Sequence, residues 1–184
     1  MYNQSFSNHE FTQAELDKEY ESCTFTNCRF EGLNLSNIQF IDCDFQGCNL
    51  SGAKLIQTGF KNVRFHTCKL LGLHFESCNP FLLELSFTHC NLQLSCFYKL
   101  KLKGTSFLHS QLHEVDFTEA DLSLANFSGS DLSQAVFDQT QLQEADFREA
   151  HSYRIHPLTN SIKKAKFSIP QATGLLLDFG IQLC

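Results

Sequence analysis

Large apolar residues recur at every fifth position along most of this chain. Phe or Leu fills fourteen successive positions of one phase, from Leu82 to Phe147, and eleven of an earlier phase, from Phe25 to Phe75. A period of five suits neither regular element. Five helical steps turn the side chain about 140° away from the previous one, and in a strand an odd spacing changes the face each time. The pattern therefore predicts a repeat architecture.

The residue two places before each Phe or Leu is also restricted, because it is small (Ala, Ser, Thr or Cys) or otherwise apolar. Residues two apart on an extended chain point to the same side, so this pair points inward and the residue between them points outward. The next two residues then turn a corner, which predicts an all-β solenoid with short flat walls. The strict alternation of Leu and Phe after Leu82, and the spacing of twenty between Cys28, Cys48 and Cys68, favour four walls per coil.

Three regions are expected along the chain. Residues 1–22 hold partial units and read as an irregular N-terminal cap or opening coil. Residues 23–152 form the repeat, interrupted near 76–82, where two extra residues and Pro80 predict a small bulge or kink because proline cannot donate a ladder hydrogen bond. Residues 153–184 read as a loop, an extended segment and a helix.

The expected C-terminal helix has recognisable ends. Ser168 suits its N-cap, Pro170 its first turn, Gln171 a capping box and Gly180 its C-cap. Its apolar stripe consists of Ala172, Leu175, Leu176 and Phe179. An open solenoid end exposes strand edges and apolar interior, so the helix either only covers this end or also meets its twin in a homodimer.

Composition excludes several classes of function. The chain has 184 residues, lacks an 18-residue apolar run and starts with a polar segment, so a single-domain cytoplasmic protein without membrane contact is expected. Seven of the nine cysteines fall in the phase of the small inward position, which favours reduced core thiols over a disulfide framework. The cysteine and histidine spacings do not match a zinc site, and catalytic and phosphate-binding motifs are absent. The sequence thus predicts no enzyme, metal or cofactor.

The units ADLSL, SDLSQ and EADFR resemble the A(D/N)LXX consensus of the pentapeptide repeat proteins. The resemblance covers roughly residues 23–152. It implies a right-handed quadrilateral β-helix with four pentapeptides per coil and a C-terminal capping or dimerisation α-helix.

Charge is segregated along the expected rod. The stretch from Glu114 to Glu149 contains nine acidic residues and one basic residue, Arg148. The stretch from Lys54 to Lys103 contains seven basic residues and two acidic ones. Closely spaced carboxylates on a rigid rod present a DNA-binding groove with closely spaced negative charge, as the phosphates of a DNA duplex do. The alternative is that Asp and Asn at the outward position are consensus residues that keep the walls soluble. Direct nucleic-acid binding is not expected, because the most charged surface has the wrong sign.

The C-terminal segment AKFSIPQATGLLLDFGI is similar to the ends of the Qnr, MfpA and microcin B17 immunity types of pentapeptide repeat protein. The resemblance implies a cytoplasmic dimer that mimics DNA, binds a type II topoisomerase (DNA gyrase or topoisomerase IV) and counters quinolones or toxins. The implied dimer contacts are Ala172, Leu175, Leu176 and Phe179. The implied topoisomerase-facing carboxylates are Glu114, Asp116, Glu119, Asp121, Asp131, Asp138, Glu144 and Asp146.

One departure from this type stands out. Qnr proteins of Gram-negative bacteria carry two longer loops, and here only the two-residue interruption near Pro80 breaks the coils. The uninterrupted coils look more like the MfpA or microcin-immunity branch. The alternative function is a scaffold or adaptor whose walls bind an unrelated protein.

Overall fold

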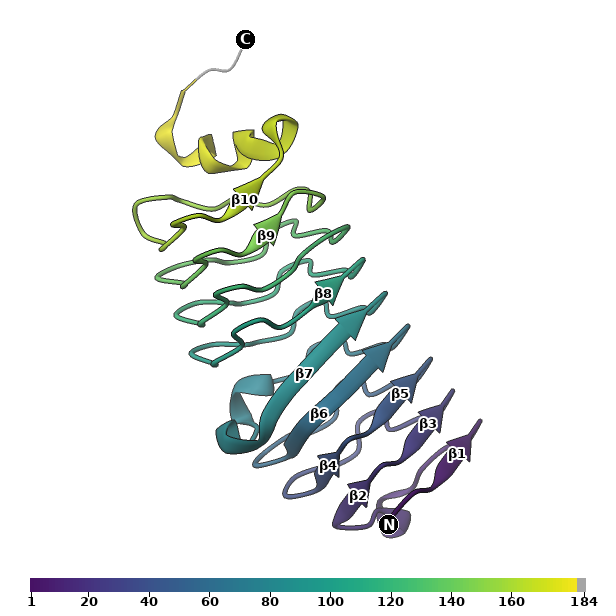
Figure 1. Ribbon diagram of the computed structural model, residues 1–184. Helices are drawn as coiled ribbons and strands as arrows, with labels where there is room; N and C mark the ends of the chain where they lie inside the picture. Colours follow the sequence, from purple (N-terminus) through teal and green to yellow (C-terminus); the bar gives the residue numbers. More distant parts are fainter. Residues whose placement is uncertain (182–184) are drawn as a thin grey trace.

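Successive turns of the chain stack on one another in parallel, and the result is a rod-like β-solenoid (Figure 1). The computed structural model describes residues 1–181. Most coils are joined by isolated parallel bridges, and the regular strands are short. They are β1 (Ser5–Ser7), β2 (Glu19–Glu21), β3 (Thr24–Thr26), β4 (Gln39–Ile41), β5 (Asp44–Gln46), β6 (Gly59–His66), β7 (Leu83–Thr88), β8 (Phe107–Leu108), β9 (Asp146–Phe147) and β10 (Lys166–Phe167).

The coil has four walls, as the sequence predicted, because partners on neighbouring coils are mostly twenty residues apart. We name the walls in chain order and define each by its outward residues. Wall A carries Ser5, Thr24, Asp44, Arg64, Ser86, Ser106, Asn126, Asp146 and Lys166; wall B carries Glu10, Arg29, Asn49, Lys69, Asn91, Gln111, Asp131 and His151; wall C carries Asn34, Lys54, His74, Cys96, Asp116 and Val136; wall D carries Glu19, Gln39, Gly59, Lys101, Asp121, Gln141 and Ser161.

Two columns of phenylalanine rings fill the centre of the later coils. Four walls place every fourth repeat residue in the same column, so Phe107 stacks on Phe127 at 5.2 Å between ring centroids and an interplanar angle of 4°. Walls A and C are opposite, and their columns meet edge to face, as Phe107 and Phe117 do at 5.5 Å and 79°. Offset and edge-to-face pairs are the favoured aromatic geometries. The repeat residues of this region are buried.

Most corners contain one residue in the left-handed conformation, two places after the inward Phe or Leu. Glu119 has a φ of 57° and Leu124 a φ of 63°. Such a φ is unfavourable for residues other than glycine, so the surrounding coils must impose it. The backbone N–H of Glu119 donates to the carbonyl of Asp138 in the next coil at 2.8 Å, which ties the corner to the stack.

The N-terminal residues form the first coil of the same stack. Phe6 stacks on Phe25 at 5.2 Å, and Tyr20 stacks on Phe40 at 5.3 Å. This coil is one residue shorter than most others, so Phe6, Phe11 and Leu16 lie one residue out of the phase that starts at Phe25. Tyr20 lies five residues before Phe25 and is in phase. Its hydroxyl accepts a hydrogen bond from the backbone N–H of Asp17 at 2.9 Å and is thereby satisfied.

The interruption consists of two short 3-10 turns, η2 (Phe75–Ser77) and η3 (Pro80–Leu82), which project from the rod (Figure 1). The ladder between β6 and β7 shifts register between Phe60 and Val63, as expected for a bulge. Within η3 the Phe81 side chain is 94% exposed.

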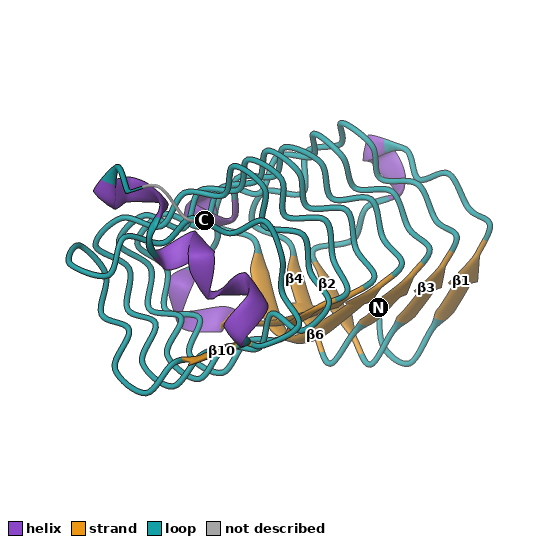
Figure 2. Cartoon of the chain, turned by 90° about the horizontal axis from the view of Figure 1, so that it is seen from above, coloured by secondary structure: helices purple, strands orange, loops and turns teal. Residues whose placement is uncertain are grey.

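The C-terminal element covers the last coil (Figure 2) but is not the expected α-helix. It consists of two 3-10 segments, η4 (Ile169–Leu175) and η5 (Leu177–Phe179). Ser168 is the N-cap, yet its side chain makes no capping hydrogen bond, so the predicted capping box is wrong. Gly180 has a φ of 63° and ends the element as predicted.

Close packing against the last coil explains the 3-10 geometry. A Cβ atom at Gly174 would lie 2.3 Å from the Tyr153 carbonyl oxygen, so only glycine fits. The Gly174 carbonyl accepts the Ile155 N–H at 3.1 Å. This acceptor is therefore engaged with the last coil, where an α-helix would use it for the N–H four residues later.

Phe127→Ala is expected to lower the free energy of unfolding by about 3–5 kcal/mol, because it removes a buried ring from the wall A column. Urea denaturation measures the change. Leu124→Ala, at an exposed corner, is the control and should cost little. A loss below about 1 kcal/mol for Phe127→Ala would contradict the core assignment.

Candidate functional site

The interior of the coils is occupied by side chains, so recognition falls to the outer walls. Within residues 1–181, no group of three or more His, Cys, Asp or Glu side chains is arranged to hold a metal ion. No helical segment of this part of the chain is long and apolar enough to cross a membrane.

The inward cysteines are structural. All eight cysteines from Cys23 to Cys96 are free thiols, and seven of them are buried. Six of these thiols donate to carbonyls of the preceding coil, as Cys48 does to Phe25 at 3.2 Å. Burial raises the pKa of Cys43 to about 11, which leaves almost no thiolate at neutral pH. Cys43 is thus a small buried group and not a reactive nucleophile.

The predicted carboxylates surround the rod and are not gathered on one wall. Asp146, Asp131, Asp116 and Asp121 lie on walls A, B, C and D in turn. The remaining four, Glu114, Glu119, Asp138 and Glu144, lie in the corners that follow Leu112, Phe117, Phe137 and Leu142.

The wall aspartates also have a structural role. The Asp121 carboxylate accepts the backbone N–H of Ser123 at 3.0 Å, and that of Asp116 accepts Thr118 N–H at 2.8 Å. Asn126 makes the same contact. Asp and Asn readily bond the backbone two residues on, which stabilises a turn. This contact gives a physical basis to the alternative that these are repeat residues, and it also fixes each carboxylate in space.

Ion pairs divide the eight carboxylates into two sets. Four of them lie within ion-pair distance of a basic side chain. The pairs are Glu119 with Lys99, Asp146 with Arg148, Glu114 with His113 and Asp131 with His151. Hydrogen bonds from Arg148 lower the pKa of Asp146 below its usual value. Within the described chain the other four have no ion pair: Asp116, Asp121, Asp138 and Glu144. Asp121 lies on wall D, Asp138 and Glu144 lie at the corners before and after it, and Asp116 lies on wall C, so most of this unpaired negative charge is on or beside wall D.

Residues 114–149 form what we call the acidic band. It contains nine carboxylates and one arginine in slightly under two coils. At about 4.8 Å per coil the band is roughly 9 Å long. Its net negative charge is therefore about one elementary charge per 1.1 Å. Duplex DNA carries a comparable density, roughly one negative charge per 1.7 Å of its axis. The coil that follows is basic, with Arg154, Lys163, Lys164 and Lys166.

The predicted dimer residues separate into two groups. Ala172 and Leu175 are half-buried, and Leu175 packs on the core. Leu176 and Phe179 are exposed, and Phe179 stacks on His156 at 5.2 Å. Leu177 and Ile181, which the stripe did not include, are exposed beside them. They escaped the prediction because an α-helical period does not describe 3-10 segments.

The double role of the wall aspartates can be tested at Asp121. Asp121→Asn keeps an oxygen acceptor for Ser123 N–H and should leave the free energy of unfolding nearly unchanged. Asp121→Ala removes the acceptor and should cost about 0.5–1.5 kcal/mol. Urea denaturation of both variants measures the difference, and equal costs would show that this hydrogen bond does not stabilise the turn.

The chain matches a family model described as the pentapeptide repeat region over residues 18–80 and 73–147. It is similar to the solved structure of full-length QnrB1, a plasmid-mediated fluoroquinolone resistance protein, with a TM-score of 0.61, 19% identity and coverage of 98% of this chain and 99% of that chain. It is also similar to HetL, a pentapeptide repeat protein involved in heterocyst differentiation regulation from the cyanobacterium Nostoc sp. strain PCC 7120. That comparison has a TM-score of 0.50 and 17% identity, and covers 92% of this chain and 87% of that chain. No curated protein sequence matches this chain.

At these identities the two solved structures show the fold alone. The family model spans more than half of the chain, and its repeat unit is the five-residue unit that builds walls A to D. The chain belongs to the pentapeptide repeat family.

Proposed function

We propose that this protein is a non-enzymatic mimic of duplex DNA that binds a type II topoisomerase in the cytoplasm and protects it from quinolone-like inhibitors or toxins. The observation that carries the proposal is the charge density of the acidic band. A positively charged groove that binds duplex phosphates also attracts a rod of similar negative charge density, and this long-range attraction increases the rate of association.

Rigidity supports the same proposal. The hydrogen bonds from Ser123 and Thr118 hold the carboxylates of Asp121 and Asp116 at fixed positions on the coil lattice. Because these side chains are ordered before binding, little conformational entropy is lost when a basic groove contacts them. Flexible carboxylates on loops would lack this advantage.

The second candidate is a scaffold or adaptor that binds an unrelated protein. It is favoured by the turn-forming role of the wall aspartates, because that role explains the presence of these residues without any partner. The descriptions of QnrB1 and HetL also show that proteins of this fold serve both drug resistance and the regulation of differentiation. The two candidates differ in whether charge or wall shape determines the partner.

We further propose a homodimer through the C-terminal element. Leu176, Leu177, Phe179 and Ile181 leave an exposed apolar surface at the end of the rod. This surface can be buried against the same surface of a second chain in a twofold-symmetric interface. The acidic bands of the two protomers would then lie on either side of the basic last coils.

The topoisomerase proposal predicts that Asp116→Asn/Asp121→Asn/Asp138→Asn weakens binding to DNA gyrase at least tenfold. The fold should stay intact, because Asn preserves the turn contacts of Asp116 and Asp121 while three charges are removed. Biolayer interferometry and gyrase supercoiling assays with and without a quinolone measure the effect. Glu10→Gln/Glu19→Gln/Glu31→Gln is the matched control at the other end of the rod. No effect of the wild-type protein on supercoiling, cleavage complexes or ATPase at micromolar concentration would favour the adaptor.

The dimer proposal predicts a solution mass of twice 21.0 kDa for the wild-type protein. Leu176→Asp/Phe179→Asp should halve this mass, because charged side chains oppose burial of the apolar surface. Light scattering coupled to size-exclusion chromatography measures it, and Ile169→Asp, at an exposed residue outside this cluster, is the control. A monomeric wild-type protein at about 100 μM would contradict the proposal.

A further inference from the structure

Wall D is split beside the projecting 3-10 turns. The ladder reaches β7 through the pairing of Phe60 with Leu83, and the next bridge on this wall joins Lys101 to Asp121. Within the described chain, no backbone hydrogen bond connects residues 83–85 to residues 101–105. The two extra residues of the interruption have thus separated neighbouring coils at this place.

Comparison with the following coil shows which groups the split leaves free. Asp121 donates its N–H to the carbonyl of Leu100 at 2.8 Å, and its carbonyl accepts Leu102 N–H at 2.8 Å. Lys101 occupies the equivalent position one coil earlier, and among residues 1–181 its backbone N–H and carbonyl have no such partner. Unpaired strand groups of this kind are a template for an added extended segment.

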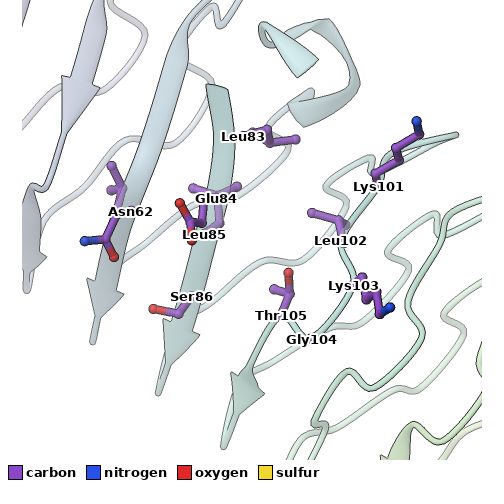
Figure 3. Close-up of a pocket in the computed structure, with 11 residues that line it drawn as sticks. Asn62, Leu83, Glu84, Leu85, Ser86, Lys101, Leu102, Lys103, Gly104 and Thr105 are labelled. Atoms are coloured by element: carbon purple, nitrogen blue, oxygen red, sulfur yellow. The ribbon is translucent and has the colours of Figure 1, made fainter. Parts of the chain in front are cut away.

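The split opens into two hollows that share Leu83 and Lys101. One, of about 260 Å³, lies between β7 and residues 101–105 (Figure 3). The other, of about 370 Å³, is lined mainly by apolar groups from Pro80, Phe81 and Leu100, together with Lys99. The second hollow is suited to an apolar side chain, with the exposed Phe81 ring beside it.

The rim of the split is basic. Lys101 and Lys103 are exposed, and neither forms an ion pair in the described part of the chain. Glu84 is the acidic residue among those that line the hollows. Free lysines next to an apolar hollow complement a ligand that carries both carboxylates and an apolar side chain.

We propose that the split in wall D is a docking site for a short, acidic, extended segment of a partner protein. The backbone of this segment pairs with the free N–H and carbonyl of Lys101. One apolar side chain enters the hollow beside Phe81, and flanking carboxylates contact Lys101 and Lys103. This site is separate from the acidic band and does not depend on the proposed topoisomerase binding.

The same wall disfavours the other occupants. A long nucleic acid lying along wall D would meet Asp121 and Glu144 in the next coils, which repel it. The acidic band of a second copy has its backbone hydrogen bonds closed within its own coils, as at Asp121, so it offers no free strand. A short extended segment avoids both problems.

The test uses fluorescein-labelled octapeptides of Asp and Glu that carry one Leu or Phe at each position in turn, followed by fluorescence polarisation with the full chain. At least one peptide should bind with a Kd below about 100 μM. Lys101→Glu/Lys103→Glu should weaken it at least tenfold, and Phe81→Ala at least fivefold. Lys54→Glu/Lys69→Glu, with the same charge change on walls C and B, should change it less than twofold. Hydrogen exchange at the Lys101 amide should slow on binding.

Four results would overturn the proposal. They are the absence of any peptide with a Kd below about 1 mM, an equal loss in the Lys54→Glu/Lys69→Glu control, and displacement of the peptide by a 20-base-pair DNA duplex at equal concentration. The fourth is a change of solution mass in Lys101→Glu/Lys103→Glu, which would identify a second copy of this chain as the occupant. Circular dichroism of each variant verifies that the coils remain folded.

Discussion

Stacking of aromatic and aliphatic side chains along the axis of the coil is the interaction on which this structure depends. A single coil cannot bury its own Phe and Leu side chains, so each is covered by the coils on either side, and stability grows by nearest-neighbour contacts. The stacked rings of Phe107, Phe127 and Phe147 show how completely one column fills its share of the interior. Because the interior is filled in this way, the chain can recognise a partner only with its surface.

The same stacking converts a sequence pattern into a surface lattice. Outward residues twenty apart lie one above the other, so a change of charge along the sequence becomes a change of charge along the rod. Wall D illustrates this, since Lys101 at the split is followed one coil later by Asp121 in the acidic band. The basic and acidic surfaces proposed here are neighbours on one wall, yet they select opposite kinds of ligand.

The period of five and the alternation of Phe and Leu were enough to predict the four walls, the inward residues and the buried thiols, because these follow from local geometry repeated many times. Tyr20 lies five residues before Phe25 but was missed because the pattern was defined by Phe and Leu, and its stacking on Phe40 shows that it belongs to the core. The 3-10 cap was missed because it results from packing of Gly174 on Tyr153, which lie in different elements.

The functional surfaces were less predictable. Composition identified the acidic residues, but the pairing of Glu119 with Lys99 depends on which coil lies next to that carboxylate. The split in wall D depends on hydrogen bonds that fail to form between Leu83 and Lys101, and the sequence showed only two extra residues and a proline.

Competition with DNA tests most directly whether the outer charge of this rod replaces a duplex. The protein is titrated into DNA gyrase bound to a fluorescently labelled duplex, at several salt concentrations. Displacement of the duplex, with an apparent affinity that falls steeply as salt rises, is the result that the account predicts. Formation of a ternary complex, with the duplex still bound at saturating protein, would contradict it.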